Sequence, residues 1–95
     1  MPTLIVSPLA EQDLVDIWLY IAEDSPVNAD RFLDKINDAV LRLAEFNAMG
    51  TARSELAPDI FSFPLARYML YYRQTDSGIE LIRVLHSSRD IALLF

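Results

Sequence analysis

The chain predicts an α+β domain in which a helical hairpin packs on one face of a small, mainly antiparallel sheet. Two observations in its 95 residues lead to this prediction. The first half holds two long amphipathic segments, each opened by a Ser-Pro pair, and the second half holds β-prone segments joined by polar turns. Because a chain of this length supports one hydrophobic core, residues 1–95 are expected to form a single domain.

The first half predicts one strand followed by two helices. Thr3–Val6 is a short β-prone run and predicts the strand. Ser7-Pro8 and Ser25-Pro26 each supply an N-cap and a proline suited to the first helical position. The helices are expected to span residues 8–24 and 26–46. Because almost no linker separates them, they are expected to pack as an antiparallel hairpin.

The two helices differ in the width of their apolar faces. The first has an apolar arc of about 200°, which predicts packing from two directions, with Trp18 as a core residue. The second has an arc of about 160°, with charged residues on the opposite side. Leu41 falls on that charged side and is expected to be exposed.

A polar segment and a short strand follow the second helix. Residues 47–57 are polar and irregular, and Gly50 is the expected C-terminal stop of the helix. Ile60–Phe63 predicts a strand, which Pro64 limits to an edge or an end of the sheet.

The last third predicts a β-hairpin. Residues 65–73 and 79–86 are the expected strands, and residues 74–78 have the composition of a turn. The apolar residues 91–95 predict a short C-terminal helix. The expected order of elements is therefore β-α-α-β-β-β, followed by that helix.

The predicted hairpin is apolar on both faces, in whichever register it pairs. One register joins Gln74 to Ile79, and a slip by one residue would exchange the faces of one strand. Because the helices are expected on only one face, the second apolar face predicts a surface for a partner. The pairs expected in that register are Gln74 with Ile79, Arg73 with Glu80 and Arg67 with His86.

Composition excludes several classes of function. The net charge of −6 lies entirely in the first 48 residues, which hold nine acidic and three basic residues, so direct nucleic-acid binding is not expected. The chain has no cysteine, which excludes a disulfide scaffold and thiol catalysis. It shows no signal peptide and no run of about 20 apolar residues, so a cytoplasmic protein without membrane contact is expected.

Candidate catalytic groups are few. His86 is the single histidine and could act as an acid or base, but a strand-end histidine that bonds a neighbour is the favoured interpretation. A metal site needs several convergent ligands, but the chain has one histidine and no cysteine. A phosphate-binding loop needs more glycines than the two that are present. We therefore expect no metal and no cofactor.

Arginines and tyrosines gather on or beside the predicted hairpin. Arginine clusters can stabilise a phosphate transition state or stack on bases, but they can also pair with acids. For Arg73 and Arg83, two roles stay equally open: pairing with an acid such as Glu80, Asp90 or Asp59, or binding a partner. Arg67 and Arg89 are expected at an interface. The candidate partner- or target-binding residues are Arg67, Tyr68, Leu70, Tyr72, Arg83, His86 and Arg89.

The order and spacing of several short motifs resemble the RelE/ParE toxin superfamily of bacterial toxin–antitoxin systems, and within it the ParE-type toxins. The resemblance covers nearly the whole chain. One departure is Ala66, since ParE relatives usually have glycine before Arg-Tyr. The matching stretches are Leu4 to Leu14, Ile17 to Ala22, Ala29-Asp30-Arg31-Phe32, Phe63 to Tyr68, Tyr72-Arg73, and Ile82 to His86 with Arg89-Asp90.

The resemblance implies a toxin of a type II system of the kind associated with plasmid stabilization. Such a toxin inhibits DNA gyrase by binding and is neutralised by a ParD-like antitoxin encoded beside it. This mode of action favours a protein that is not an enzyme, and no catalytic residue carries over. The open sheet face and the groove around the first helix are expected to receive the antitoxin, either as an added strand or as a helix in the groove.

Two alternatives stay open. RelE-type relatives are ribosome-dependent mRNA endoribonucleases, and Arg89 matches one of their basic positions. However, Tyr68 aligns with their active-site arginine, and their C-terminal tyrosine is absent. The second alternative is a non-toxic partner-binding module with the same fold.

Overall fold

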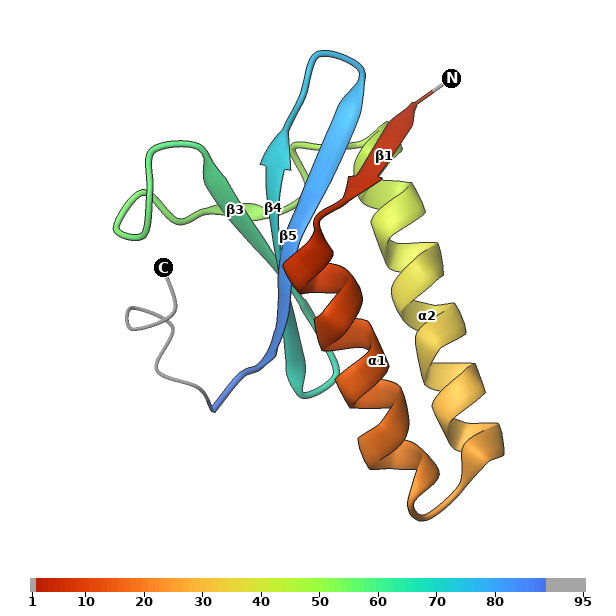
Figure 1. Ribbon diagram of the computed structural model, residues 1–95. Coiled ribbons are helices and arrows are strands. Elements are labelled where there is room, and N and C mark those ends of the chain that lie inside the picture. The colour runs from red at the N-terminus through yellow and green to blue at the C-terminus, as the bar shows by residue number, and fades with distance from the viewer. Residues whose placement is uncertain (1, 89–95) are drawn as a thin grey trace.

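Two helices cover one face of a five-stranded sheet in the computed structural model, which describes residues 2–88 (Figure 1). The strand order is β1-β5-β4-β3-β2, with β1 parallel to β5 and all other neighbours antiparallel. This is the predicted α+β architecture. The elements are β1 Thr3–Val6, α1 Pro8–Ala22, α2 Pro26–Glu45, β2 Thr51–Ala52, β3 Ile60–Leu65, β4 Tyr68–Gln74 and β5 Gly78–His86.

Both helices begin at the predicted serine caps. The Ser7 hydroxyl accepts a hydrogen bond from the Ala10 N–H (3.1 Å), and the Ser25 hydroxyl accepts one from the Asn28 N–H (3.2 Å). Each cap satisfies an N–H group that has no partner within its helix. The prediction that Gly50 stops the second helix is wrong, because α2 already ends at Glu45.

Because Gly50 has no side chain, it allows the loop after α2 to lie close to Ser62 of β3 and Tyr72 of β4. A Cβ at this position would lie 2.3 Å from the Tyr72 hydroxyl oxygen and 2.8 Å from the Ser62 carbonyl oxygen. The residues after it form β2, a two-residue strand within the segment that the sequence predicts to be irregular.

A tight turn at Ala66-Arg67 separates β3 from β4, so Leu65 ends β3 and does not begin the next strand as predicted. Ala66 adopts φ 55°, in the left-handed region. Residues with a Cβ reach this region at a cost of about 1–2 kcal/mol, whereas glycine does not meet this penalty.

Ala66→Gly is therefore expected to raise the free energy of unfolding by about 0.5–1 kcal/mol, after subtracting the greater entropy of glycine in the unfolded chain. Urea denaturation measures this change. Ala52→Gly is the control: Ala52 is exposed in β2 and has no positive φ, so its replacement is expected to lower stability. A loss of stability in Ala66→Gly would contradict the strain at this turn.

The hairpin of β4 and β5 follows the predicted register only near its turn. Gln74 pairs with Ile79 and Arg73 with Glu80, as predicted, but a bulge at Tyr71/Tyr72 shifts the remaining pairs by one residue. His86 therefore pairs with Tyr68 and not with Arg67. Without the bulge, Leu85 would share the face of Leu81 beneath the helices. With it, Val84 packs beneath the helices and Leu85 on the far side of the sheet.

The main core lies between the helices and the sheet. Ile36, Val40 and Leu43 of α2 meet Leu70 and Tyr72 of β4 there. The prediction that Trp18 is a core residue is wrong, because this side chain is only half-buried. Its indole N–H donates to Asp30 Oδ1 (2.8 Å) and so links α1 to α2.

The wide apolar arc of α1 packs against both α2 and β5, as predicted, but these two elements do not cover its whole width. Val15 and Leu19 are about half exposed, so they lie on the side of the arc that the sheet and α2 do not cover. Leu41 of α2 is exposed, as predicted.

A second, smaller core occupies the far face of the sheet, which the sequence predicts to be open. Ile60, Tyr71 and Leu85 are buried there, with Leu56 and Ala57 of the preceding loop packed against them. The prediction of an open apolar sheet face is therefore wrong, because the chain covers part of this face with its own loop.

Two further predictions concern the C-terminal segment and contact with a membrane. The predicted C-terminal helix at 91–95 lies outside the described residues. Within residues 2–88, neither helix combines the length and the apolarity that crossing a membrane requires.

Candidate partner-binding groove

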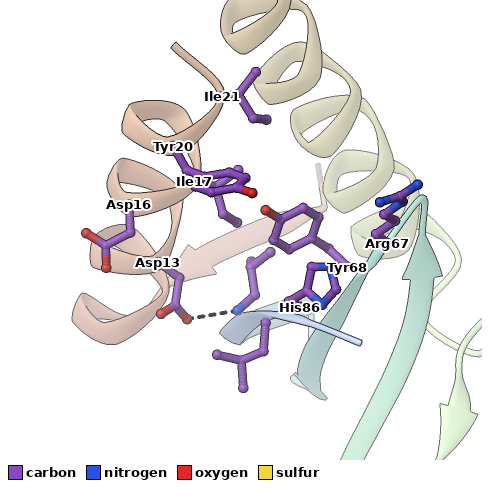
Figure 2. A pocket seen from close by; sticks show the side chains of 10 residues that line it. Asp13, Asp16, Ile17, Tyr20, Ile21, Arg67, Tyr68 and His86 are labelled. Carbon is purple, nitrogen blue, oxygen red and sulfur yellow. Dashed lines mark hydrogen bonds between the residues drawn. The ribbon is translucent and has the colours of Figure 1, made fainter. Parts of the chain in front are cut away.

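A groove of about 460 Å³ runs between α1 and the ends of β4 and β5 (Figure 2). It brings together three of the predicted binding residues, Arg67, Tyr68 and His86. Apolar side chains of α1 and β5 complete it. Within residues 2–88, the lining consists of Asp13, Asp16, Ile17, Tyr20, Ile21, Arg67, Tyr68, Val84, Leu85 and His86.

The wall of the groove depends on how α1 is attached to β5. Because β1 ends at Val6, the part of β5 beyond Leu81 has no neighbouring strand on that side among the residues that the structure describes. Polar groups at and near the start of α1 replace it: the Ser7 N–H donates to the Leu81 carbonyl (3.0 Å) and the Ser7 hydroxyl to the Ile82 carbonyl (2.8 Å). These bonds occupy backbone groups that an edge strand would otherwise leave unpaired.

Asp13 continues this attachment six residues after Ser7, nearly two helical turns along α1. Its carboxylate accepts hydrogen bonds from Arg83 Nε (2.8 Å), Arg83 Nη2 (3.0 Å) and the Val84 N–H (2.9 Å). The two side chains are largely buried, 10% and 17% exposed. Bonding to Asp13 raises the pKa of Arg83, so this guanidinium is charged at every physiological pH.

Asp13 is the important residue of this region that sequence reasoning missed. It lies three residues after buried Ala10 and four before buried Ile17, so it shares their helical face. A carboxylate at that spacing, together with an arginine inside an apolar strand, is the signal that could have identified the pair.

Tyr68 forms the aromatic floor of the groove. Its ring lies 5.4 Å from Phe32 and 5.4 Å from His86, the latter in an edge-on arrangement. Burial, and secondarily the nearby Tyr20, raises the pKa of Tyr68. Tyr20 stands on the rim with 70% of its surface exposed, and the two hydroxyl groups point toward each other (Figure 2).

His86 ends β5 and bonds its neighbour, which is the interpretation favoured from sequence. Its Nδ1 accepts from the Ser88 N–H (3.1 Å) and lies 2.7 Å from the Ser88 hydroxyl. Because a backbone N–H can only donate, Nδ1 is the acceptor and the neutral ring carries its proton on Nε2. Arg67, in the β3–β4 turn, is exposed, and its carbonyl accepts from the Ser87 N–H (2.8 Å).

Three other predicted binding residues, Leu70, Tyr72 and Arg83, do not line this groove. Leu70 is fully buried beneath the helices, and Arg83 is paired with Asp13, so both hold the fold together. Arg73 pairs with Asp59 (3.0 Å) and with Glu80 (3.7 Å), two of the predicted acids. Arg89 lies outside the described residues.

Tyr72 is also a core residue rather than a binding residue. It is fully buried; its hydroxyl donates to the Asn47 carbonyl (2.8 Å) and accepts from the Gly50 N–H (2.9 Å). The tyrosine therefore fastens the loop after α2 to the sheet. Burial raises its pKa above the ordinary value of 10.0.

Tyr72→Phe is expected to lower the free energy of unfolding by about 1–2 kcal/mol at pH 7, because Gly50 loses its bonding partner. The wild-type chain gains stability from protonated Tyr72 below the unfolded-state pKa near 10, and loses it as pH rises through the higher folded-state pKa. The difference between wild type and variant should therefore shrink above pH 10. Urea denaturation at pH 7, 9 and 10.5 measures it, and a constant difference would contradict this role.

Comparison with known proteins shows which family the chain belongs to. A family model described as the ParE toxin of type II toxin-antitoxin system, parDE, matches residues 4–91. The chain belongs to this ParE toxin family. It is 30% identical over 89 residues to Toxin ParE1 of Mycobacterium tuberculosis (strain ATCC 25618 / H37Rv), covering 92% of this chain and 91% of that one. It is 27% identical over 88 residues to Toxin RelE3 of Caulobacter vibrioides, covering 92% and 96%.

The fold of the ParE-family toxin also matches a solved structure. A chain of the chromosomal ParDE TA system from P. aeruginosa aligns with a TM-score of 0.75 at 21% identity, covering 90% of this chain and 96% of that one. The recognition from sequence motifs is confirmed, and the protein is the toxin of a type II toxin–antitoxin system.

Proposed function

We propose that this ParE-family toxin inhibits DNA gyrase and is neutralised by a ParD-like antitoxin that occupies the groove between α1 and β5. One observation carries the proposed antitoxin binding: the groove combines an apolar and aromatic interior with exposed charged groups at its rim. Concave apolar surfaces with a few polar groups are the usual places where proteins bind a segment of a partner.

The hydrogen bonding of β5 favours one of the two modes of antitoxin binding. Ser7 and Asp13 already bond the edge of β5 at Leu81, Ile82 and Val84. An added strand would have to displace these bonds, whereas side chains of a helix or an irregular segment can enter the groove without doing so. We infer that the antitoxin binds through side chains in the groove.

Family membership supports gyrase inhibition as the proposed mode of action, and the charge distribution suits a protein target. The acidic helical half makes nucleic acid a poor direct partner, since phosphate binding needs a basic surface. A toxin that binds gyrase acts in the cytoplasm, where replication takes place, and a system of this kind can stabilise a plasmid that carries it.

A ribosome-dependent endoribonuclease is the second candidate function. Two observations favour it: Tyr68, His86 and Arg67 share one groove, and one relative bears the name RelE3. Histidine and tyrosine can transfer protons, and arginine can stabilise a phosphate transition state.

Expression in a bacterial host without the antitoxin separates these candidates. Gyrase inhibition predicts growth arrest with induction of the DNA-damage response and intact mRNA, and co-expression of the antitoxin should restore growth. Full toxicity retained in both His86→Ala and Arg89→Ala would contradict the endoribonuclease. Cleaved mRNA that disappears in His86→Ala would support the endoribonuclease, and growth without arrest would identify a non-toxic binding module.

A further inference from the structure

The groove has two sides of opposite charge. Asp16 of α1 and Arg67 of the β3–β4 turn lie on opposite sides of it, with Ile17 and Tyr68 between them (Figure 2). Both residues are exposed, and neither forms an ion pair with another of residues 2–88. Asp16 accepts a hydrogen bond from the neutral amide of Gln12 (2.9 Å), so its negative charge is not compensated by that contact.

The second carboxylate of the groove contributes much less charge. Asp13 is bonded through both oxygens to Arg83, and this pair is nearly neutral as a whole. Among the described residues, Asp16 therefore supplies the charge of the negative side of the groove.

His86 adds a hydrogen-bond donor on the side of Arg67. Because Ser88 occupies Nδ1, the neutral ring carries its proton on Nε2. The His86 ring packs edge-on against Tyr68, which links it to the aromatic floor. This side thus presents a guanidinium and an imidazole N–H, both suited to a carboxylate.

We propose that the groove selects an antitoxin segment with a bulky apolar side chain placed between a basic and an acidic one. The basic side chain would pair with Asp16 and the acidic one with Arg67 and His86, while the apolar side chain fills the space beside Ile17 and Tyr68. This inference rests on the proposed function, because it takes the antitoxin as the occupant. The polarity of the groove would then fix the direction in which the segment lies.

Charge-reversal variants test this inference, with the antitoxin protein encoded beside this chain as the probe. Asp16→Lys and Arg67→Glu are each expected to weaken binding at least about tenfold in calorimetric titration, since each places like charges together. Asp34→Lys and Arg42→Glu change the net charge equally on the exposed side of α2 and should alter affinity less than about threefold.

The double variant Asp16→Lys/Arg67→Glu is the decisive one. It keeps the net charge of the wild type but reverses the polarity of the groove, so its binding should be at least as weak as that of either single variant. Affinity near that of the wild type would overturn the inference. Thermal melting monitors folding, and Asp16→Asn with Arg67→Gln offers a milder pair, for which weaker losses of about threefold are expected.

The outcomes separate this inference from the proposed function. Tight binding of wild type with affinity unchanged in all variants contradicts the charge selection alone. No binding of the antitoxin to folded wild-type chain contradicts the proposed neutralisation and, with it, the inference.

Discussion

Asp13→Ala is expected to lower the free energy of unfolding by about 3 kcal/mol, which corresponds to a fall in Tm of about 15 °C for a domain of this size. The substitution leaves Arg83, only 17% exposed, without its partner, and removes the acceptor of the Val84 N–H. Breaking a largely buried charged pair costs more than the pair contributes, because one charge stays desolvated. Urea denaturation at pH 7 measures the loss.

Two further variants give this prediction its controls. Asp16→Ala, one turn along α1 but exposed, should change stability by less than about 0.5 kcal/mol. The double variant Asp13→Ala/Arg83→Met removes the unpaired charge and should be more stable than Asp13→Ala alone. A loss below about 1 kcal/mol in Asp13→Ala would show that α1 is held to β5 by other contacts.

Gly78→Ala is expected to cost at least about 2–3 kcal/mol and to displace β1. A Cβ at Gly78 would lie 1.9 Å from the Thr3 carbonyl oxygen and 2.7 Å from the Thr3 nitrogen. These are backbone atoms, which cannot rotate away as a flexible side chain would. The strand must move instead, which disturbs the Thr3 N–H bond to the Ser77 carbonyl (2.9 Å).

Ser77→Ala is the matched control for this substitution. It removes an exposed hydroxyl bond to Thr3 (2.9 Å) next to the same position and should cost less than about 1 kcal/mol. Amide hydrogen exchange should show lost protection in residues 3–6 of Gly78→Ala alone. Wild-type stability and unchanged exchange in Gly78→Ala would contradict the close approach of β1 and β5.

The architecture was predictable because local signals are strong at the helix starts. Ser-Pro pairs at Ser7 and Ser25 mark both caps, and the turn after Gln74 marks the main hairpin. The register was predictable only next to that turn. The bulge at Tyr71/Tyr72 depends on how β5 packs against α1 on one face and the loop on the other, and no short-range pattern encodes that choice.

The candidate site was predictable only in part, because it too depends on packing between segments that are far apart in the sequence. Arg67, Tyr68 and His86 do meet in one groove, but Leu70 and Tyr72, which alternate with other apolar residues in β4, proved to be core. Alternation shows which residues share a face but not which face the helices cover when both are apolar. Asp13 escaped notice because its partner lies 70 residues away in sequence.

The direct test of gyrase inhibition is the supercoiling of relaxed plasmid by purified DNA gyrase in the presence of the folded toxin. Supercoiling should fall as the toxin is added, and an equimolar amount of the antitoxin should restore it. The matched variant Asp16→Lys/Arg67→Glu, if still inhibitory, should resist this restoration. Full supercoiling at a large molar excess of folded wild-type toxin would contradict gyrase as the target.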